Sequence, residues 1–247
     1  MATVYYLPGR GGRLHSGLGK AIYDRGFDIT GRETVGTFSE LVFSEQVATV
    51  AQDLRAHFWD ESARVIANSF GAYLFLHAQA GLPAFPGRVL LLSPIVGGFY
   101  DDSPGTGFVP PLAEKLFQLA RAGNMPNPQR CEMHVGSLDW QCDPEKVCDL
   151  GALIGVSATV VPCSPKGWAK LRFTLERAIW VAGERWHSKQ RNETLADGRY
   201  VLEIPYSDER ELVGDLLRFG ADVEVLEPAE LRAKVKRALH AAVGRYV

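Results

Sequence analysis

Residues 64–77 of this 247-residue chain read RVIANSFGAYLFLH. The apolar run Val65–Ala67 is typical of a short buried strand, and the residues from Phe70 onward have the apolar spacing of a helix. Almost no residues are left between the two for a loop. A strand that turns directly into a helix strains the residue at the turn and directs its side chain outward. We therefore expect Ser69 to stand exposed at that turn.

The pentapeptide Ala67–Gly71 fits the pattern G-x-S-x-G, with alanine in place of the first glycine. Small residues flank the serine because strand and helix pass close together there. In its setting of strand, turn and helix, the pentapeptide resembles the nucleophile elbow of the α/β-hydrolase family. The resemblance implies that Ser69 is a catalytic nucleophile. The alternative is a serine that serves only as the N-cap of a helix.

The first part of the chain alternates apolar strands with helical segments. Strands are predicted at Thr3–Leu7, Phe27–Thr30, Val65–Ala67, Arg88–Ser93, Cys131–Val135 and Ala158–Pro162. Helices are predicted over residues 14–25, 45–58, 70–78, 112–122, 144–153 and 166–181. Apolar strands separated by helices indicate a parallel sheet covered on both faces. We predict an α/β fold with a mostly parallel, doubly wound sheet in residues 1–180, like that of the α/β-hydrolases, followed by a small α+β module.

The glycine loop Pro8–Gly12 follows the first predicted strand. It is not a phosphate-binding P-loop, because Lys20 is not followed by serine or threonine. The equivalent loop of the hydrolase family is often H-G-G-G-like. The resemblance implies that N–H groups of Arg10 and Gly11 complete an oxyanion hole with the N–H of Phe70. The alternative is a tight turn that needs glycine for positive φ.

Asp139 follows the strand Cys131–Val135 in the sequence HVGSLD. This loop resembles the acid loop of the hydrolase family, and the order of serine before aspartate is also the family's order. The resemblance implies that Asp139 orients a catalytic histidine and stabilises its charged form. A turn or cap role is the alternative. Asp143 competes for the acid role, but its place before Pro144 favours a helix cap.

A histidine is missing from residues 162–168, where the hydrolase family carries its catalytic base. Without a base, a serine hydroxyl is a weak nucleophile at neutral pH. Four histidines are badly placed, on helices, within a strand or beyond a long predicted helix: His57, His77, His134 and His187. His15 directly follows the glycine loop, at the sheet edge that carries Ser69. We expect His15 to be the base. The alternative is that the protein keeps the fold but has lost catalysis and only binds a ligand.

Residues 184–247 carry a second set of motifs. These are W-H-x-x-Q from 186, a D-G turn at 197, E-L…L-L-x-F-G from 211, V-x-V-L-x-P-x-x-L-R from 223, and Tyr246. They resemble the C-terminal extension of WYL-domain regulators. The residues themselves predict a small α+β module with strands at 199–204 and 223–226. One helix is capped by Asp208 and ends at Gly220, and an amphipathic helix covers 230–246.

The resemblance to WYL regulators implies a homodimer or a protein partner that binds through this module. Neither a helix-turn-helix nor the WYL core itself is found in the chain. Residues 184–247 contain 11 Lys and Arg against 12 Asp and Glu. Because nucleic-acid binding requires a basic surface, we expect no nucleic-acid partner.

Composition limits the remaining classes of function. The formal net charge is −2, and no apolar run reaches the roughly 18 residues of a membrane-spanning helix. The beginning of the chain has no features of a signal peptide. Four cysteines without C-x-x-C spacing indicate reduced thiols, hence a cytoplasmic protein without a metal site. We expect no cofactor and no membrane partner.

The function predicted from the sequence is hydrolysis of an ester or thioester of a small molecule. Residues 97–125 begin with a Gly- and Pro-rich stretch and continue into an amphipathic helix. Such a segment suits a mobile lid with an apolar lining.

Overall fold

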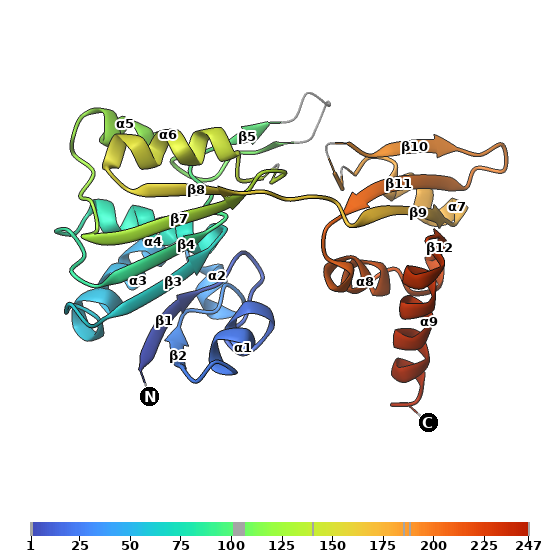
Figure 1. The fold of residues 1–247 in the computed structure, drawn as a ribbon, viewed down its shortest axis with the longest axis horizontal. Helices are drawn as coiled ribbons and strands as arrows, with labels where there is room; N and C mark the ends of the chain where they lie inside the picture. The colour runs from blue at the N-terminus through green and yellow to red at the C-terminus, as the bar shows by residue number, and fades with distance from the viewer. Residues whose placement is uncertain (1, 101–106, 140, 185, 188, 247) are drawn as a thin grey trace. The chain divides into compact units, whose positions relative to one another are not determined.

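The computed structural model describes residues 2–100, 107–139, 141–184, 186–187 and 189–246. It divides into two compact units (Figure 1). The first is formed by residues up to 100 together with 107–162, and the second is formed by residues from 163 onward. Each unit has its own apolar core.

The first unit contains a six-stranded sheet in the order β2-β1-β3-β4-β7-β8, with every neighbouring pair parallel. The predicted α/β fold is confirmed. The strands are β1 Thr3–Leu7, β2 Asp28–Gly31, β3 Arg64–Asn68, β4 Arg88–Leu92, β7 Arg130–Gly136 and β8 Ser157–Val161. The helices are α1 Gly17–Tyr23, α2 Thr37–Glu40, α3 Phe43–His57, α4 Phe70–Ala80, α5 Lys115–Arg121 and α6 Pro144–Ile154.

The first part of the predicted lid (residues 97–125) contains a short antiparallel pair, β5 Phe99–Tyr100 and β6 Gly107–Phe108. Part of the predicted lid, residues 101–106, lies outside the described residues. The predicted helix over 112–122 begins only at Lys115.

One face of the parallel sheet carries the main core. Side chains from alternate strand positions, such as Tyr5, Val65 and Met133, point to this face and are at most 2 % exposed. Helix α4 is buried on nearly all sides because it packs against the sheet and between α3 and α5. Its largely apolar sequence follows from that position.

The other face of the sheet is covered at one end only. There, Ile22 of α1 packs with Val4 and Tyr6 of β1 in a small separate core. Further along the sheet, Ile66 and Leu90 of the central strands are only half-buried. Within the first unit, helices thus lie on both faces of the sheet, but on this face only near β1 and β2. The chain after β8 continues directly into β9 of the second unit, so no helix follows β8 within the first unit.

The second unit contains an antiparallel sheet in the order β10-β11-β9-β12. Its strands are β9 Gly167–Phe173, β10 Arg191–Thr194, β11 Tyr200–Tyr206 and β12 Val223–Glu227. Its helices are α7 Leu175–Val181, α8 Glu209–Leu217 and α9 Ala229–Val243, with a 3₁₀ turn at Gly220–Asp222. The side chain of Asp208 caps α8 by accepting a hydrogen bond from the N–H of Arg210 at 2.8 Å.

The predicted helix over residues 166–181 is wrong. Residues 167–173 form β9, in which Ala169, Leu171 and Phe173 are fully buried and the residues between them are not. This alternation has the period of a strand, and it takes precedence over the helical propensity of single residues. Only α7 is helical, and its N-cap is Thr174, whose side chain accepts a hydrogen bond from the N–H of Arg177.

Candidate functional site

Ser69 lies at the junction between the end of β3 and the start of α4. Its backbone has φ 51° and ψ −119°, a conformation that residues other than glycine rarely adopt. Hydrogen bonds to neighbouring elements hold it there. Its N–H donates to the carbonyl of Leu92 at 3.0 Å, and its carbonyl accepts from the N–H of Tyr73 at 3.2 Å.

Close packing around Ser69 explains the small residues beside it. A Cβ on Gly71 would lie 2.1 Å from the carbonyl oxygen of Leu7, so the first turn of α4 passes directly over the end of β1. A Cβ on Gly9 would lie 3.2 Å from that of Ser69. Ala67 is fully buried. The glycine loop and the serine turn therefore lie against each other, as the pairing of Leu7 with Ala67 in β1 and β3 requires.

The glycine loop is held in place by Thr34, a buried residue that follows β2. The Thr34 hydroxyl donates to the carbonyl of Gly9 and accepts from the N–H of Gly12 at 2.9 Å. The backbone of Thr34 exchanges hydrogen bonds with the loop as well, including one from the N–H of Gly11 at 3.3 Å. Sequence reasoning missed Thr34 because no local motif connects it to a loop 22 positions away.

The three predicted oxyanion-hole residues differ in their geometry. The N–H of Gly11 already donates to Thr34, and Gly11 has φ 75°, as a tight turn requires. The N–H groups of Arg10 and Phe70 have no hydrogen-bond partner within the described part of the chain. Two donors from adjacent loops are thus available at the carboxyl edge of the sheet.

A small recess lies beside these donors. It has a volume of about 170 Å³ and is lined by Arg10, Thr34, Ser39, Leu41, Phe43, Gln46, Phe70 and Pro111. Ser69 itself does not line it. The Arg10 guanidinium lies 5.5 Å from the ring centre of Phe70 and 5.2 Å from that of Phe108, which belongs to the predicted lid. The hydroxyl of Tyr73 donates to the carbonyl of Pro111 at 2.7 Å. The lid segment after 107 is therefore attached to both α4 and the glycine loop.

Asp139 follows β7 at the same sheet edge. Its Oδ1 accepts hydrogen bonds from the N–H groups of Gln141 at 3.1 Å and Cys142 at 3.0 Å, so it stabilises its own turn. Its Oδ2 has no partner among the residues that the structure describes. Asp143 instead caps α6, where its side chain accepts from the N–H groups of Glu145 and Lys146.

Two further residues connect the Asp139 turn to the loop after β4. The thiol of Cys142 donates to the carbonyl of Ser93 at 2.7 Å. Burial and the neighbouring Asp139 carboxylate raise the pKa of this thiol, so it stays protonated. Ser93 has φ 42° and follows β4 as Ser69 follows β3. Sequence reasoning overlooked both residues, because only the pairing of β4 with β7 brings them together.

No histidine is hydrogen-bonded to Ser69 or Asp139 among the described residues. His15 is exposed in the turn before α1. His134 contacts Glu132, with 3.1 Å between Nε2 and Oε2. His77 is buried on α4, with its ring centre 4.4 Å from that of Tyr73, and burial lowers its pKa to about 4. His187 accepts a hydrogen bond from the N–H of Lys189 in the second unit.

Comparison with known proteins gives one domain match. Residues 165–243 match the WCX domain family. This confirms the resemblance of the tail to the C-terminal extension of WYL-domain regulators, and it adds β9 and α7 to the matched region. No match was found among curated proteins.

Several solved structures are similar at low sequence identity. The ydeN gene product from B. subtilis shares 13 % identity over 65 % of this chain and 85 % of its own, with a TM-score of 0.46. Alpha/beta hydrolase domain-containing protein 10 from mouse shares 12 % sequence identity over 65 % of this chain and 79 % of its own, with a TM-score of 0.47. MGS-MChE2 is an alpha/beta hydrolase enzyme from a lagoon sediment metagenome. It shares 14 % sequence identity over 65 % of this chain and 79 % of its own, with a TM-score of 0.41.

The described residues lack two further features. None of their helices has the length and apolar character needed to cross a bilayer. They also contain no cluster of three or more His, Cys, Asp or Glu side chains arranged to hold a metal ion.

Proposed function

We propose that the first unit is a serine hydrolase that acts on an ester or thioester of a small molecule, with Ser69 as the nucleophile. The observation that carries this proposal is the backbone of Ser69, with φ 51° at the turn between β3 and α4. Strain of this kind costs about 1–3 kcal/mol and is concentrated at functional sites. An N-cap serine would have an extended backbone and would accept a hydrogen bond from the helix. Ser69 does neither.

The chemistry would follow the usual steps of acyl transfer. The Ser69 hydroxyl attacks the carbonyl carbon, its proton passes to a base, and the alcohol or thiol leaves with a proton. Water then releases the acid from the acyl-serine. The free N–H groups of Phe70 and Arg10 would hold the oxyanion, whereas Gly11 must first give up its hydrogen bond to Thr34. The 170 Å³ recess suits a short acyl group.

The proposed site still requires a general base near Ser69. Strands β3 and β7 are separated by β4, so their ends stand about 10 Å apart. That gap leaves room for an imidazole between the Ser69 hydroxyl and the free Oδ2 of Asp139. We propose that His15 fills it. Because His15 is exposed in a turn, the turn must move to bring its ring within about 3 Å of the hydroxyl.

Covalent labelling of the full chain with a fluorophosphonate, read by intact mass, tests the nucleophile. We expect wild type to gain one adduct and Ser69→Ala to gain none. Hydrolysis of short-chain aryl esters tests the base, because loss of a triad member typically costs several orders of magnitude. His15→Ala should then be nearly as inactive as Ser69→Ala. Full activity of His15→Ala would exclude His15 as the base.

A second candidate function is ligand binding without catalysis. The observation that favours it is that no histidine is bonded to Ser69 or Asp139 among the described residues. If wild type is neither labelled nor active on any aryl ester tried, the first unit is a binding protein. Calorimetry would then test whether the first unit binds short-chain carboxylates.

For the second unit we propose an assembly role. Helix α7 exposes Leu175, Ile179 and Trp180, which are 56 %, 75 % and 70 % accessible. Large apolar side chains grouped on one short helix favour a protein contact, with a second copy of the chain or with another protein. The near-neutral charge of residues 184–247 argues against nucleic acid. We also propose a cytoplasmic location, since Cys131, Cys142 and Cys148 form no disulfide among the described residues.

A further inference from the structure

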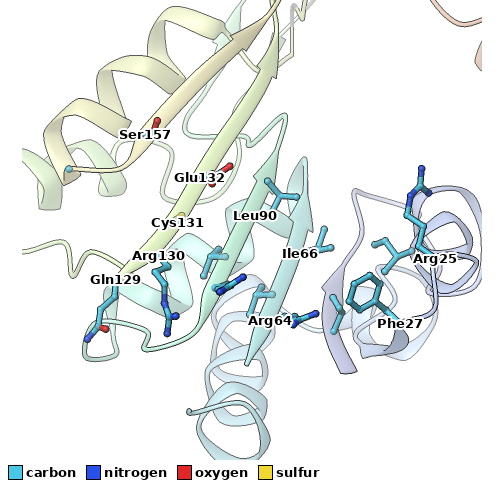
Figure 2. A pocket seen from close by; sticks show the side chains of 16 residues that line it. Arg25, Phe27, Arg64, Ile66, Leu90, Gln129, Arg130, Cys131, Glu132 and Ser157 are labelled. Carbon is cyan, nitrogen blue, oxygen red and sulfur yellow. The ribbon is translucent and has the colours of Figure 1, made fainter. Parts of the chain in front are cut away.

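The open face of the parallel sheet forms a second hollow, separate from the proposed catalytic site (Figure 2). Its volume is about 880 Å³. Its floor is apolar and includes Ile66 of β3 and Leu90 of β4, with Phe27 at one side. In the covered face of the same sheet, the equivalent space is filled by α3, α4, α5 and α6.

Three arginines stand in register along one end of this hollow. Arg64 pairs with Arg88 in the sheet, and Arg88 pairs with Arg130. Like charges at directly opposite sheet positions repel and destabilise the pairing. Such a row is therefore retained at a cost, unless an anion neutralises it.

The described residues leave these three charges without a carboxylate partner. The Arg130 guanidinium donates only to the carbonyls of Glu61 and Pro86. The Arg64 guanidinium lies over the ring of Phe27, 5.4 Å from its centre. Arg88 is exposed, and its guanidinium makes no hydrogen bond within the described residues.

Charge along the whole hollow is unbalanced. Its lining includes a fourth arginine, Arg25, and one carboxylate, Glu132. Glu132 is already in contact with His134. The open face is thus apolar in the middle and strongly basic at one end.

We propose that this face is the docking surface for an amphipathic helix of a partner protein, with apolar residues at helical spacing and carboxylates at one end. An α-helix, about 10–12 Å across, is the element that normally covers a parallel sheet. Arginine guanidinium groups bind carboxylates bidentately, so acidic residues would neutralise the Arg64–Arg88–Arg130 row.

Two other occupants fit less well. A small molecule on an open sheet face would keep most of its surface in water, whereas ligand sites bury 70–90 % or more of their ligand, as a rough guide. A second copy packed face to face would bring four more arginines and one more glutamate to the interface. The two basic surfaces would repel each other.

The probe is a fluorescein-labelled synthetic helix of about four turns, with leucines at i, i+3, i+4 and i+7 and glutamates at one end. A second peptide carries lysines in place of the glutamates, and a third carries serines in place of the leucines. Fluorescence anisotropy is measured with the full chain as wild type, Arg88→Glu and Arg88→Ala. Arg237→Glu on α9 is the matched control, since Arg237 is also exposed and its substitution changes the charge by the same amount.

We expect saturable binding of the acidic peptide alone, weakened at higher salt. Arg88→Glu should weaken it by about tenfold or more and Arg88→Ala by less, while Arg237→Glu leaves it within about twofold. Circular dichroism checks that each variant is folded. The proposal is overturned if the acidic peptide does not bind, if all three peptides bind alike, or if neither Arg88 variant weakens binding. Self-association of wild type that Arg88→Glu abolishes would make a second copy the occupant, and would also overturn it.

Discussion

At the scale of single residues, the structure separates side chains that pack from those that remain available for chemistry. Ser69 is held by backbone hydrogen bonds on both sides, yet its hydroxyl makes none within the described residues. Asp139 uses one carboxylate oxygen to stabilise its turn and leaves the other free. His77 shows the opposite case, because it is buried among aromatic rings and its Nε2 has no hydrogen-bond partner among the described residues.

His77 leads to a prediction about how the stability of the fold depends on pH. Burial, with a smaller effect from Lys115, holds the pKa of His77 at about 4, below its ordinary value of 6.5. The unfolded chain therefore takes up this proton between pH 6.5 and pH 4 while the folded chain does not. The free energy of unfolding therefore keeps the full contribution of neutral His77 above pH 6.5. It decreases as the pH falls from 6.5 to 4, by up to about 3 kcal/mol.

The variant His77→Phe should remove this loss, because a neutral ring replaces the titrating one. Hydrogen exchange of the α4 amides, followed by mass spectrometry at pH 7 and pH 5, measures the effect. We expect wild type to lose protection at pH 5 relative to the variant, and the two to be similar at pH 7. Equal loss in both proteins would show that His77 does not titrate in this range.

At the scale of elements, the serine site depends on how closely α4 passes over the end of β1. This contact explains why Gly71 is glycine while the first small position, Ala67, accepts a methyl group. The glycine loop depends in the same way on a distant segment, because Thr34 holds it through both backbone and side-chain hydrogen bonds.

We predict that Gly71→Ala destabilises the first unit by about 1–3 kcal/mol. Its Cβ would lie 2.1 Å from the carbonyl oxygen of Leu7, so the helix must shift away from β1. Gly81→Ala at the other end of α4 is the control, because its nearest neighbour would be an ordinary 3.7 Å away. Urea unfolding and the rate of fluorophosphonate labelling measure stability and site geometry. Equal behaviour of the two variants would contradict the close approach.

At the scale of the whole molecule, the chain joins two units with separate cores and different sheet types. The last parallel strand, β8, is followed by β9 of the other unit and not by a helix of its own. The connection from β8 to β9 thus marks the division between the two units.

Assembly is the prediction at this scale. If α7 joins two copies, wild type should sediment as a dimer at micromolar concentration, and Ile179→Glu should be monomeric because a charge would be buried at the contact. Val243→Glu, which also changes an exposed apolar residue, should leave the dimer intact. A monomeric wild type would leave a different protein as the partner of α7. Tight, salt-sensitive binding of a DNA oligonucleotide would contradict the expectation that the module does not bind nucleic acid.

The amino-acid sequence by itself determined the parallel α/β architecture, the turn at Ser69 and the existence of a separate C-terminal module. These features depend on local periodicity and on small residues at fixed spacing, which are readable without long-range contacts. Only the tertiary structure decided that residues 167–173 belong to the sheet of the second unit, because the strands that they pair with, β11 and β12, come later in the chain. It also decided that Thr34 holds the glycine loop and that one face of the sheet is open. Those features arise from contacts between residues far apart in the chain, and no local pattern records them.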